Sequence, residues 1–271
     1  MKYILITNEP DLAEKAEQFG VSRIFIDLEQ LGKFERQGHL DTFISSHSMA
    51  DVAKVRARLS KAELLVRLNP LNENTKQEID EAIEGGADIL MLPMFHHASE
   101  LRSFSEMVGR RAGVMPLLET YSATQEIDEI VTIPGVTEIY IGLNDLHLDM
   151  KLKFMFEPLA NGLVDKLADV AKAAGLPFGF GGIARVGEGI IPGELVLGEH
   201  LRLGSSAVIL SRTFNRKDES CSKEDVVETL REELEKLQAA KKELIQRDAE
   251  KQQEDCLRLK NIVTDFVAQR S

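Results

Sequence analysis

Short apolar runs alternate with amphipathic segments along the first 215 residues of the chain. Several of these runs are almost continuously apolar and rich in β-branched residues, which is typical of parallel strands that are buried on both faces. We expect strands at Tyr3–Thr7, Arg23–Leu28, Glu63–Leu68, Asp88–Leu92, Gly113–Leu118, Thr137–Gly142, Pro177–Phe180 and Ala207–Leu210.

The segments between these strands have the three- to four-residue apolar spacing of amphipathic helices. The expected helices are Asp11–Phe19, Ser48–Leu59, Thr75–Glu84, Ala98–Val108, Ser122–Val131, Glu157–Ala174 and, with a weaker pattern, Glu188–Gly198. Eight strands that each lead into a helix close most naturally as an α/β fold of the TIM type, a (β/α)8 barrel. A doubly wound open sheet is the alternative, but such sheets usually contain fewer units.

The pattern changes at Ser222, after which the chain contains no glycine or proline. Ser222 and Asp225 resemble a capping box at the start of a helix. Apolar residues then recur at helical spacing, at Val226, Leu230, Leu234, Leu237 and Leu244. We therefore divide the chain into a barrel core at 1–215 and a C-terminal helical segment at 222–271.

Part of the C-terminal segment should form the last barrel helix, and the remainder is longer than one barrel can cover. We expect its later apolar residues to pack on another subunit, as part of a homo-oligomer; these are Leu257, Ile262, Val263 and Phe266. A solvated, partly frayed tail is the alternative.

The formal net charge of −12 excludes some classes of partner. An acidic chain repels nucleic acid and anionic membranes, so we expect neither as a partner. No apolar stretch approaches the length of a membrane span, and the N-terminus lacks the pattern of a signal peptide. Cys221 and Cys256 have no metal-ligand spacing and are expected to be free thiols, which favours a cytoplasmic protein.

Charged residues lie at the C-terminal ends of four expected strands. Asp27 and Glu29 follow the second strand, Arg67 the third, Glu119 the fifth and Asp145 the sixth. Catalytic groups of a barrel project from these strand ends, where the loops that lead into the helices gather. The sequence therefore predicts four carboxylates and one guanidinium around a single rim.

Two of these carboxylates, Glu119 and Asp145, come from neighbouring strands and could share a hard cation such as Mg²⁺ or Mn²⁺. Arg67 offers a planar fork for a carboxylate or enolate oxygen. Taken alone, either carboxylate could cap the following helix, and Arg67 could be a structural ion-pair partner. Their common position on the rim favours a functional site.

Five motifs, with a sixth as weaker support, carry a resemblance to a known family. They are IDLEQ at 26–30, VRLNP at 66–70, GADILMLPM at 86–94, LLET at 117–120, IGLNDLHLDM at 141–150 and, more weakly, SSAVIL at 205–210. In this order and spacing the chain resembles the HpcH/HpaI aldolase and citrate lyase β-subunit family from about residue 24 to about residue 212. The barrels of that family act on pyruvate-like enolates.

The resemblance implies a divalent-metal-dependent carbon–carbon lyase of the aldolase type that acts on a 2-oxo acid, with a possible aldehyde co-substrate, and it also points to a homo-oligomer. It matches Glu119 and Asp145 to the metal-ligand carboxylates. The substrate-binding positions that it implies are Arg67, Gly142 and the backbone around Leu118 and Thr120.

The chain also departs from the family pattern. Gln30 stands where the aldolase branch has histidine and the citrate lyase branch has an acidic residue, and glutamine cannot transfer a proton. The general base is therefore unassigned, and the candidates are Glu29, His47, His147 and a water on the metal. His47 could instead be a loop residue beside a helix start, and His147 could face outward.

Two other functions stay open. A CoA-thioester lyase of the citryl or malyl type would need a basic groove, of which Arg110, Arg111 and Arg185 are the only sign. A non-catalytic ligand-binding or scaffold barrel is the second alternative, because the family histidine is missing. The glycine-rich end of the seventh strand, at 179–182, could bind phosphate or could only allow a tight turn.

Overall fold

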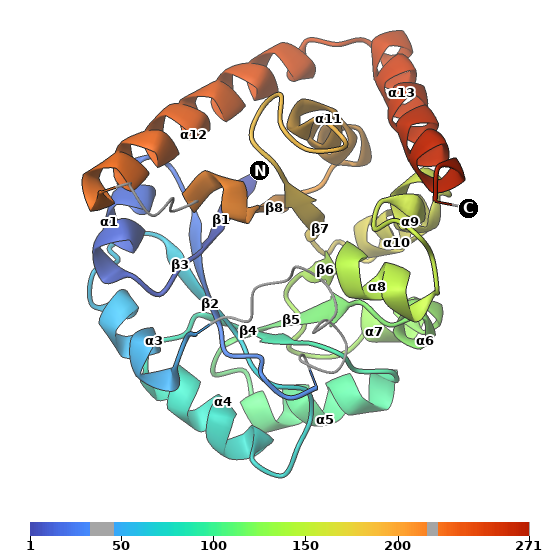
Figure 1. Ribbon diagram of the computed structural model, residues 1–271. Coiled ribbons are helices and arrows are strands. Elements are labelled where there is room, and N and C mark those ends of the chain that lie inside the picture. The colour runs from blue at the N-terminus through green and yellow to red at the C-terminus, as the bar shows by residue number, and fades with distance from the viewer. Residues whose placement is uncertain (33–45, 216–221, 271) are drawn as a thin grey trace.

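The computed structural model describes residues 1–32, 46–215 and 222–270, and its parallel strands close into a barrel in the order β1 to β8 (Figure 1). The strands are β1 Lys2–Ile6, β2 Arg23–Asp27, β3 Glu63–Arg67, β4 Ile89–Leu92, β5 Gly113–Leu118, β6 Ile139–Ile141, β7 Phe178–Ile183 and β8 Ala207–Leu210. Each of them overlaps an expected strand. The prediction of a (β/α)8 barrel is confirmed, and the open sheet is excluded.

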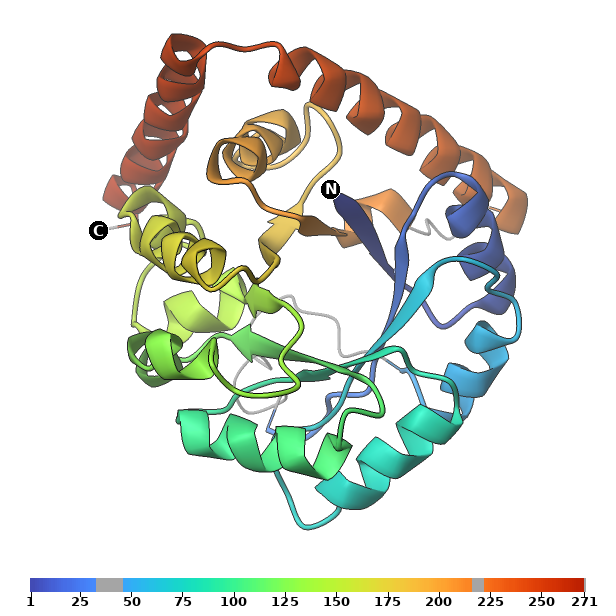
Figure 2. The same ribbon diagram turned by 180° about the vertical axis from the view of Figure 1, so that it is seen from behind.

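The helices surround this barrel, as both face-on views show (Figures 1 and 2). They are α1 Pro10–Gln18, α3 Met49–Arg56, α4 Thr75–Glu84, α5 Ala98–Val108, α6 Tyr121–Gln125, α7 Ile127–Ile130, α8 Leu143–Asp149, α9 Glu157–Ala160, α10 Leu163–Ala173, α11 Gly193–Leu203, α12 Lys223–Ile245 and α13 Ala249–Ala268, with a 3₁₀ turn, η1, at Arg212–Asn215. The sequence predicted one helix at Ser122–Val131 and one at Glu157–Ala174, and each of these is broken into two.

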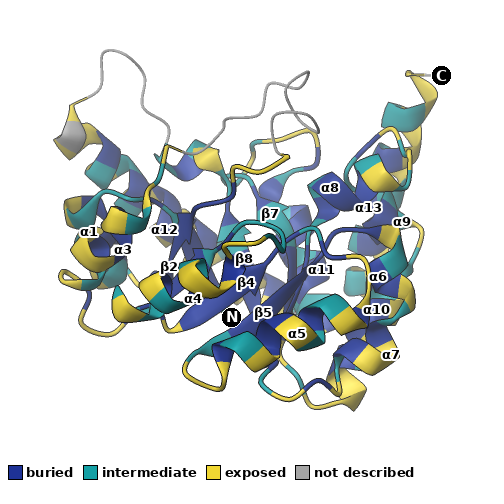
Figure 3. Cartoon of the chain, turned by 90° about the horizontal axis from the view of Figure 1, so that it is seen from below, coloured by how far each residue is buried: buried dark blue, intermediate teal, exposed yellow. Residues whose placement is uncertain are grey.

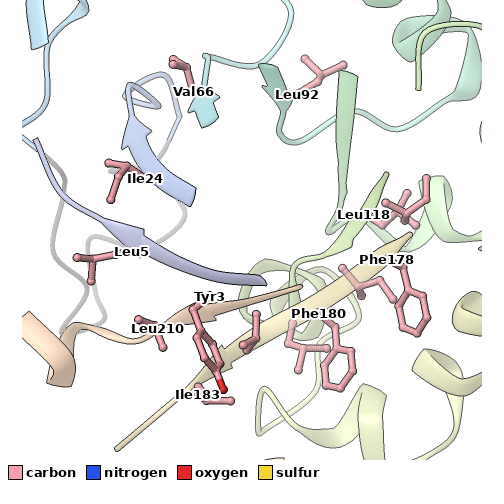
Figure 4. Packing of buried hydrophobic residues seen from close by; sticks show 14 of the residues in the cluster. Tyr3, Leu5, Ile24, Val66, Leu92, Leu118, Phe178, Phe180, Ile183 and Leu210 are labelled. Carbon is pink, nitrogen blue, oxygen red and sulfur yellow. The ribbon is translucent and has the colours of Figure 1, made fainter. Parts of the chain in front are cut away.

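The core has two layers, which follow from the alternation of side chains along each strand. One set of buried residues lies between the strands and the helices; Figure 4 shows members of it, such as Tyr3 and Leu5 on β1. A smaller set, which includes Phe25, Leu65 and Leu117, fills the interior of the barrel. Figure 3 shows the same gradient, with buried strands inside and exposed faces on the outer helices. Because side chains keep alternating along a strand, the residues two positions after Phe25, Leu65 and Leu117 point toward the barrel mouth.

An ion-pair network closes the N-terminal end of the barrel. Arg23 is fully buried and donates two hydrogen bonds to Glu138, at 3.0 and 2.6 Å. Its guanidinium also pairs with Glu63 at 2.6 Å, and Glu63 accepts a bond from Lys2 at 2.7 Å. A buried charge of this kind is tolerated because it is paired and fully hydrogen-bonded.

Tyr140 closes the barrel at a different place, between β7 and β8, where the strand register shifts. Its hydroxyl donates to the carbonyl of Gly181 at 2.8 Å and accepts from the backbone N–H of Ile209 at 2.8 Å. The phenol therefore replaces a hydrogen bond that the shifted ladder cannot make.

We expect Tyr140→Phe to lower the free energy of unfolding by about 1–3 kcal/mol, because two buried backbone groups lose their partner. Urea denaturation measures this change. Tyr3→Phe is the matched control: the Tyr3 hydroxyl is buried and has no hydrogen-bond partner among the described residues, so its removal should cost nothing or stabilise the protein. Equal losses in the two variants would contradict the bridging role of Tyr140.

The C-terminal helices pack on this chain itself, α12 against α1 and α11, and α13 against α11 and α9. Val263 is buried, Ile262 packs against the core, and the Phe266 ring lies 4.2 Å from that of Phe154. Contrary to the expectation, Ile262, Val263 and Phe266 therefore pack within this chain, because the chain reverses after α12 and lays α13 back on the barrel. Leu257 remains half exposed, and its packing on another subunit stays a prediction, as does the homo-oligomer.

Two sequence-based expectations concern the membrane and the cysteines. None of the helices within the described ranges is both long and apolar enough to cross a membrane.

Cys256 is a buried free thiol on α13, and burial raises its pKa above the usual value. Cys221 lies outside the described residues.

Candidate active site

Arg67 stands at the end of β3, directly beside Asp27, its register partner on β2. Its Nε and Nη2 atoms each donate to Asp27 at 2.9 Å, and Nη2 also lies 3.3 Å from Glu29. Burial alone would lower the pKa of Arg67, but the charges of Asp27 and Glu29 outweigh it and hold that pKa above its ordinary value. The guanidinium is thus permanently charged and held rigidly at the mouth.

Glu119 follows β5 and is almost fully buried. Burial raises the pKa of Glu119 well above its usual range, and the neighbouring charge of Asp145 raises it further, although Arg67 partly opposes this. The carboxylate accepts the backbone N–H of Met94 at 3.0 Å, and Met94 has a left-handed backbone with φ of 51°. The two carboxylates therefore act on each other electrostatically in a site that disfavours their joint ionisation.

Gly142 provides the space for the Glu119 side chain. A Cβ atom at this position would lie 2.8 Å from Glu119 Oε2 and 2.9 Å from its Cβ, so a larger residue would displace the carboxylate. Gly142 also precedes α8, whose first turn carries the buried Asp145. The end of β6 thus makes room for one carboxylate and supplies the other.

The side chains of Leu118 and Thr120 are used elsewhere. Leu118 is fully buried in the layer between strands and helices. The Thr120 hydroxyl donates to the carbonyl of Phe95 at 2.7 Å and caps the start of α6 by accepting from Ala123 N. Only the backbone of these two residues can face a ligand, as the resemblance implies.

The two candidate histidines have opposite tautomers in the neutral state. His47 Nδ1 accepts the backbone N–H of Asp27 at 3.0 Å, so its proton must be on Nε2. His147 Nδ1 is bonded to the carbonyl oxygen of Asn144, which can only accept, so its Nε2 carries the lone pair. His147 is also buried and does not face outward. A neutral His47 can therefore donate a proton through Nε2, whereas His147 can accept one.

The side chain of Asn69 fixes the backbone that follows β2. Its Oδ1 accepts the N–H groups of Gln30 and Leu31 at 2.9 and 3.0 Å, and its Nδ2 donates to Glu78 at 3.1 Å. This holds Glu29 against Arg67 while Gln30 is exposed. Asn69 and Met94 were not predicted as site residues, and Asp27 was predicted at the rim without its bond to Arg67. The register of β2 and β3 could have identified that pair, but a backbone donor such as Met94 leaves no signal in the sequence.

Close packing explains why glycines stand at the end of β7. A Cβ on Gly181 would lie 2.8 Å from Leu143 Cδ1, and its carbonyl holds the Tyr140 hydroxyl. Arg185 beyond them is 3.8 Å from Glu188. These contacts favour the interpretation as turn glycines over a phosphate site.

Glu119 and Asp145 are the residues that could hold a metal ion. Within the described parts of the chain no group of three or more His, Cys, Asp or Glu side chains is placed to do so. A cation here would therefore have two protein ligands, with water and substrate completing its shell, which is usual for Mg²⁺. The donor chemistry fits, since a divalent cation would relieve the repulsion that raises the pKa of Glu119.

Comparisons with known proteins give a family and a fold. The sequence pattern of the HpcH/HpaI aldolase/citrate lyase family matches residues 3–176. No curated protein sequence matches significantly. Similar solved structures include an HpcH/HpaI aldolase from Desulfitobacterium hafniense DCB-2, with 16% identity, a TM-score of 0.59, and coverage of 78% of this chain and 85% of that one.

Two further structures have the same fold. One is an HpcH/HpaI aldolase/citrate lyase family protein from Burkholderia cenocepacia J2315, with 16% identity, a TM-score of 0.61 and coverage of 88% of this chain and 93% of that one. The other is macrophomate synthase, with 13% identity, a TM-score of 0.53 and coverage of 78% of this chain and 76% of that one. At such identities the likeness extends to the fold alone.

Proposed function

The chain belongs to the HpcH/HpaI aldolase/citrate lyase family, and from this we propose that it is a divalent-metal-dependent carbon–carbon lyase of the aldolase type that acts on a 2-oxo acid or its enolate. The observation that carries the proposal is the grouping of Glu119, Asp145 and Arg67 at the mouth of one barrel. Two coupled carboxylates and a rigid guanidinium are the groups that such chemistry requires.

Glu119 and Asp145 would hold Mg²⁺ or Mn²⁺, and the cation would supply Lewis-acid stabilisation to the enolate. Arg67 uses Nε and Nη2 for its carboxylate partners, and within the described residues its Nη1 atom makes no hydrogen bond. We assign Nη1 to the substrate, where it would donate to a carboxylate or enolate oxygen.

For proton transfer we favour His147, because its neutral tautomer leaves Nε2 as an acceptor. His47 has its proton on Nε2 when neutral and is better suited to donate. Glu29 is almost fully buried and paired with Arg67, so its charge already serves that ion pair.

Isothermal calorimetry with pyruvate or oxaloacetate tests this function. We expect wild-type protein to bind either acid in the presence of Mg²⁺ or Mn²⁺ and to lose that binding in EDTA, because the ligand needs the cation to chelate. The double variant Glu119→Gln/Asp145→Asn should not bind under any condition. Asp169→Asn, at an exposed carboxylate on α10, is the control and should bind as the wild type does.

Binding that survives EDTA or the double substitution would contradict the metal site. An absence of binding with every metal would overturn the proposal for small 2-oxo acids and would favour a CoA thioester or a non-catalytic barrel.

A further inference from the structure

A groove of about 510 Å³ lies between helices on the outer flank of the barrel. It is bounded by α6, α7, the end of α8 and α10, which Figures 1 and 2 show together on one side of the molecule. Its apolar lining includes Ile127, Leu167 and Val170. Small-molecule sites typically have volumes of about 300–1,000 Å³, so this groove has the size of one.

The polar part of the groove has one cation, Lys166, with the amide side chains of Gln125 and Asn161. Lys166 is exposed and forms no ion pair within the described residues, whereas Lys172 on the same helix is paired with Asp169 at 2.8 Å. Asp165, the carboxylate next to Lys166 in sequence, is instead bound to Arg202 at 2.9 Å.

The groove also lies near the start of α10, where the helix macrodipole adds partial positive charge. Together with Lys166, this gives one end of the groove a preference for an anion. A single lysine carries too little charge to select a diphosphate or a CoA ester, whose recognition uses several cations.

The wall of the groove is continuous with the segments that carry the two site carboxylates. Tyr121 lines the groove and follows Glu119 by two residues, and its backbone N–H donates to Asp149 at 2.6 Å. Asp149 lies one helical turn after Asp145 on α8. The groove is therefore separate from the barrel mouth but built on the same two strand ends.

We propose that this groove binds a small amphipathic monocarboxylate, with its aromatic or aliphatic part against Leu167 and Val170 and its carboxylate at Lys166. The proposal goes beyond the proposed function and does not depend on it. It requires both the apolar floor and the cation, so that a ligand with only one of the two properties should bind less well.

Naphthoate is a suitable probe, because the protein contains no tryptophan and the naphthyl fluorescence can be followed directly. We expect saturable binding, and about tenfold weaker binding of naphthamide, the neutral analogue. Lys166→Gln should raise the Kd of naphthoate about tenfold and leave that of naphthamide unchanged. Lys172→Gln, on the same helix but outside the groove, is the matched control and should change neither.

A second variant, Val170→Glu, puts a negative charge on the floor and should abolish naphthoate binding, with a thermal melt to verify folding. The proposal is overturned if naphthoate and naphthamide bind equally, or if Lys166→Gln and Lys172→Gln have the same effect. An absence of saturation up to about 10 mM overturns it as well. Displacement of naphthoate by pyruvate with Mg²⁺ would also overturn the proposal, since the probe would then occupy the barrel mouth.

Discussion

Glu119→Gln should reduce metal-dependent turnover by at least about 10²–10³-fold and, at neutral pH, make the metal-free protein more stable than the wild type. Burial and the charge of Asp145 raise the pKa of Glu119 in the folded state. Forcing this carboxylate to ionise therefore costs folding free energy that a neutral glutamine does not cost. A loss of function accompanied by a gain in stability is the signature expected of a cation site without its cation.

The stability of the metal-free protein should change with pH in a definite direction. The folded state holds the Glu119 proton more tightly than the unfolded state, so the wild type in EDTA should lose stability as the pH rises above the ordinary glutamate pKa. This loss continues until the pH exceeds the folded-state pKa. Glu119→Gln should lack this part of the decline. Mg²⁺ or Mn²⁺ should restore the stability of the wild type but not that of the variant.

Urea unfolding from about pH 5 to about pH 8, with EDTA or with metal, measures both effects. Turnover is followed as metal-dependent exchange of the pyruvate methyl protons with deuterium. Glu106→Gln, at an exposed position on α5, is the matched control and should change neither property. A Glu119→Gln profile parallel to that of the wild type would show that Glu119 does not carry the raised pKa.

The strands of this fold could be predicted because each barrel strand is an apolar run of the right length between helical patterns. The break between α6 and α7 could not, because it depends on a distant contact, whereas the break between α9 and α10 falls at Gly162, where φ is 86°. Glu126 ends α6 while its carboxylate accepts the backbone N–H of Ala98 at 2.6 Å. The short helix α8 was missed because Leu143–Asp149 is too short for its apolar spacing to be distinctive.

The reversal between α12 and α13 did leave a signal. Asp248 caps α13 by accepting the backbone N–H of Lys251 at 2.9 Å, as an aspartate at a helix start often does. The absence of glycine and proline obscured this boundary, so the segment was interpreted as one extension that reaches another subunit. In a helix-rich segment, an N-cap residue can thus mark a turn that the usual helix breakers do not.

The placement of the carboxylates and Arg67 at the strand ends was predicted from the sequence, and the alternation along β2, β3 and β5 explains why side chains there face the barrel mouth. Asp27, Arg67 and Glu119 lie two residues beyond Phe25, Leu65 and Leu117 in the barrel interior. What the sequence could not give is which contacts each group already uses. The ion pair of Arg67 with Asp27 leaves only one edge of the guanidinium for a ligand.

Arg67→Lys should lower the rate of metal-dependent exchange about 10²–10³-fold, although it keeps the positive charge. An ammonium group cannot reproduce the two parallel bonds to Asp27 while also presenting a third N–H toward the substrate. The loss should appear mainly in kcat if Nη1 serves the enolate, and mainly in KM if it serves the substrate carboxylate. Metal affinity should change much less, because Glu119 and Asp145 remain.

Arg56→Lys is the matched control, since Arg56 also pairs with an aspartate, Asp88, at 2.9 Å, but outside the barrel mouth. Exchange should be unaffected in this variant. Arg67→Met separates charge from structure: it leaves Asp27 and Glu29 buried without their cation, which should cost about 3–5 kcal/mol of folding free energy. If Arg67→Lys exchanged pyruvate protons as fast as Arg56→Lys does, Arg67 would only hold the strand ends together, and the enolate would have to be stabilised by the cation alone.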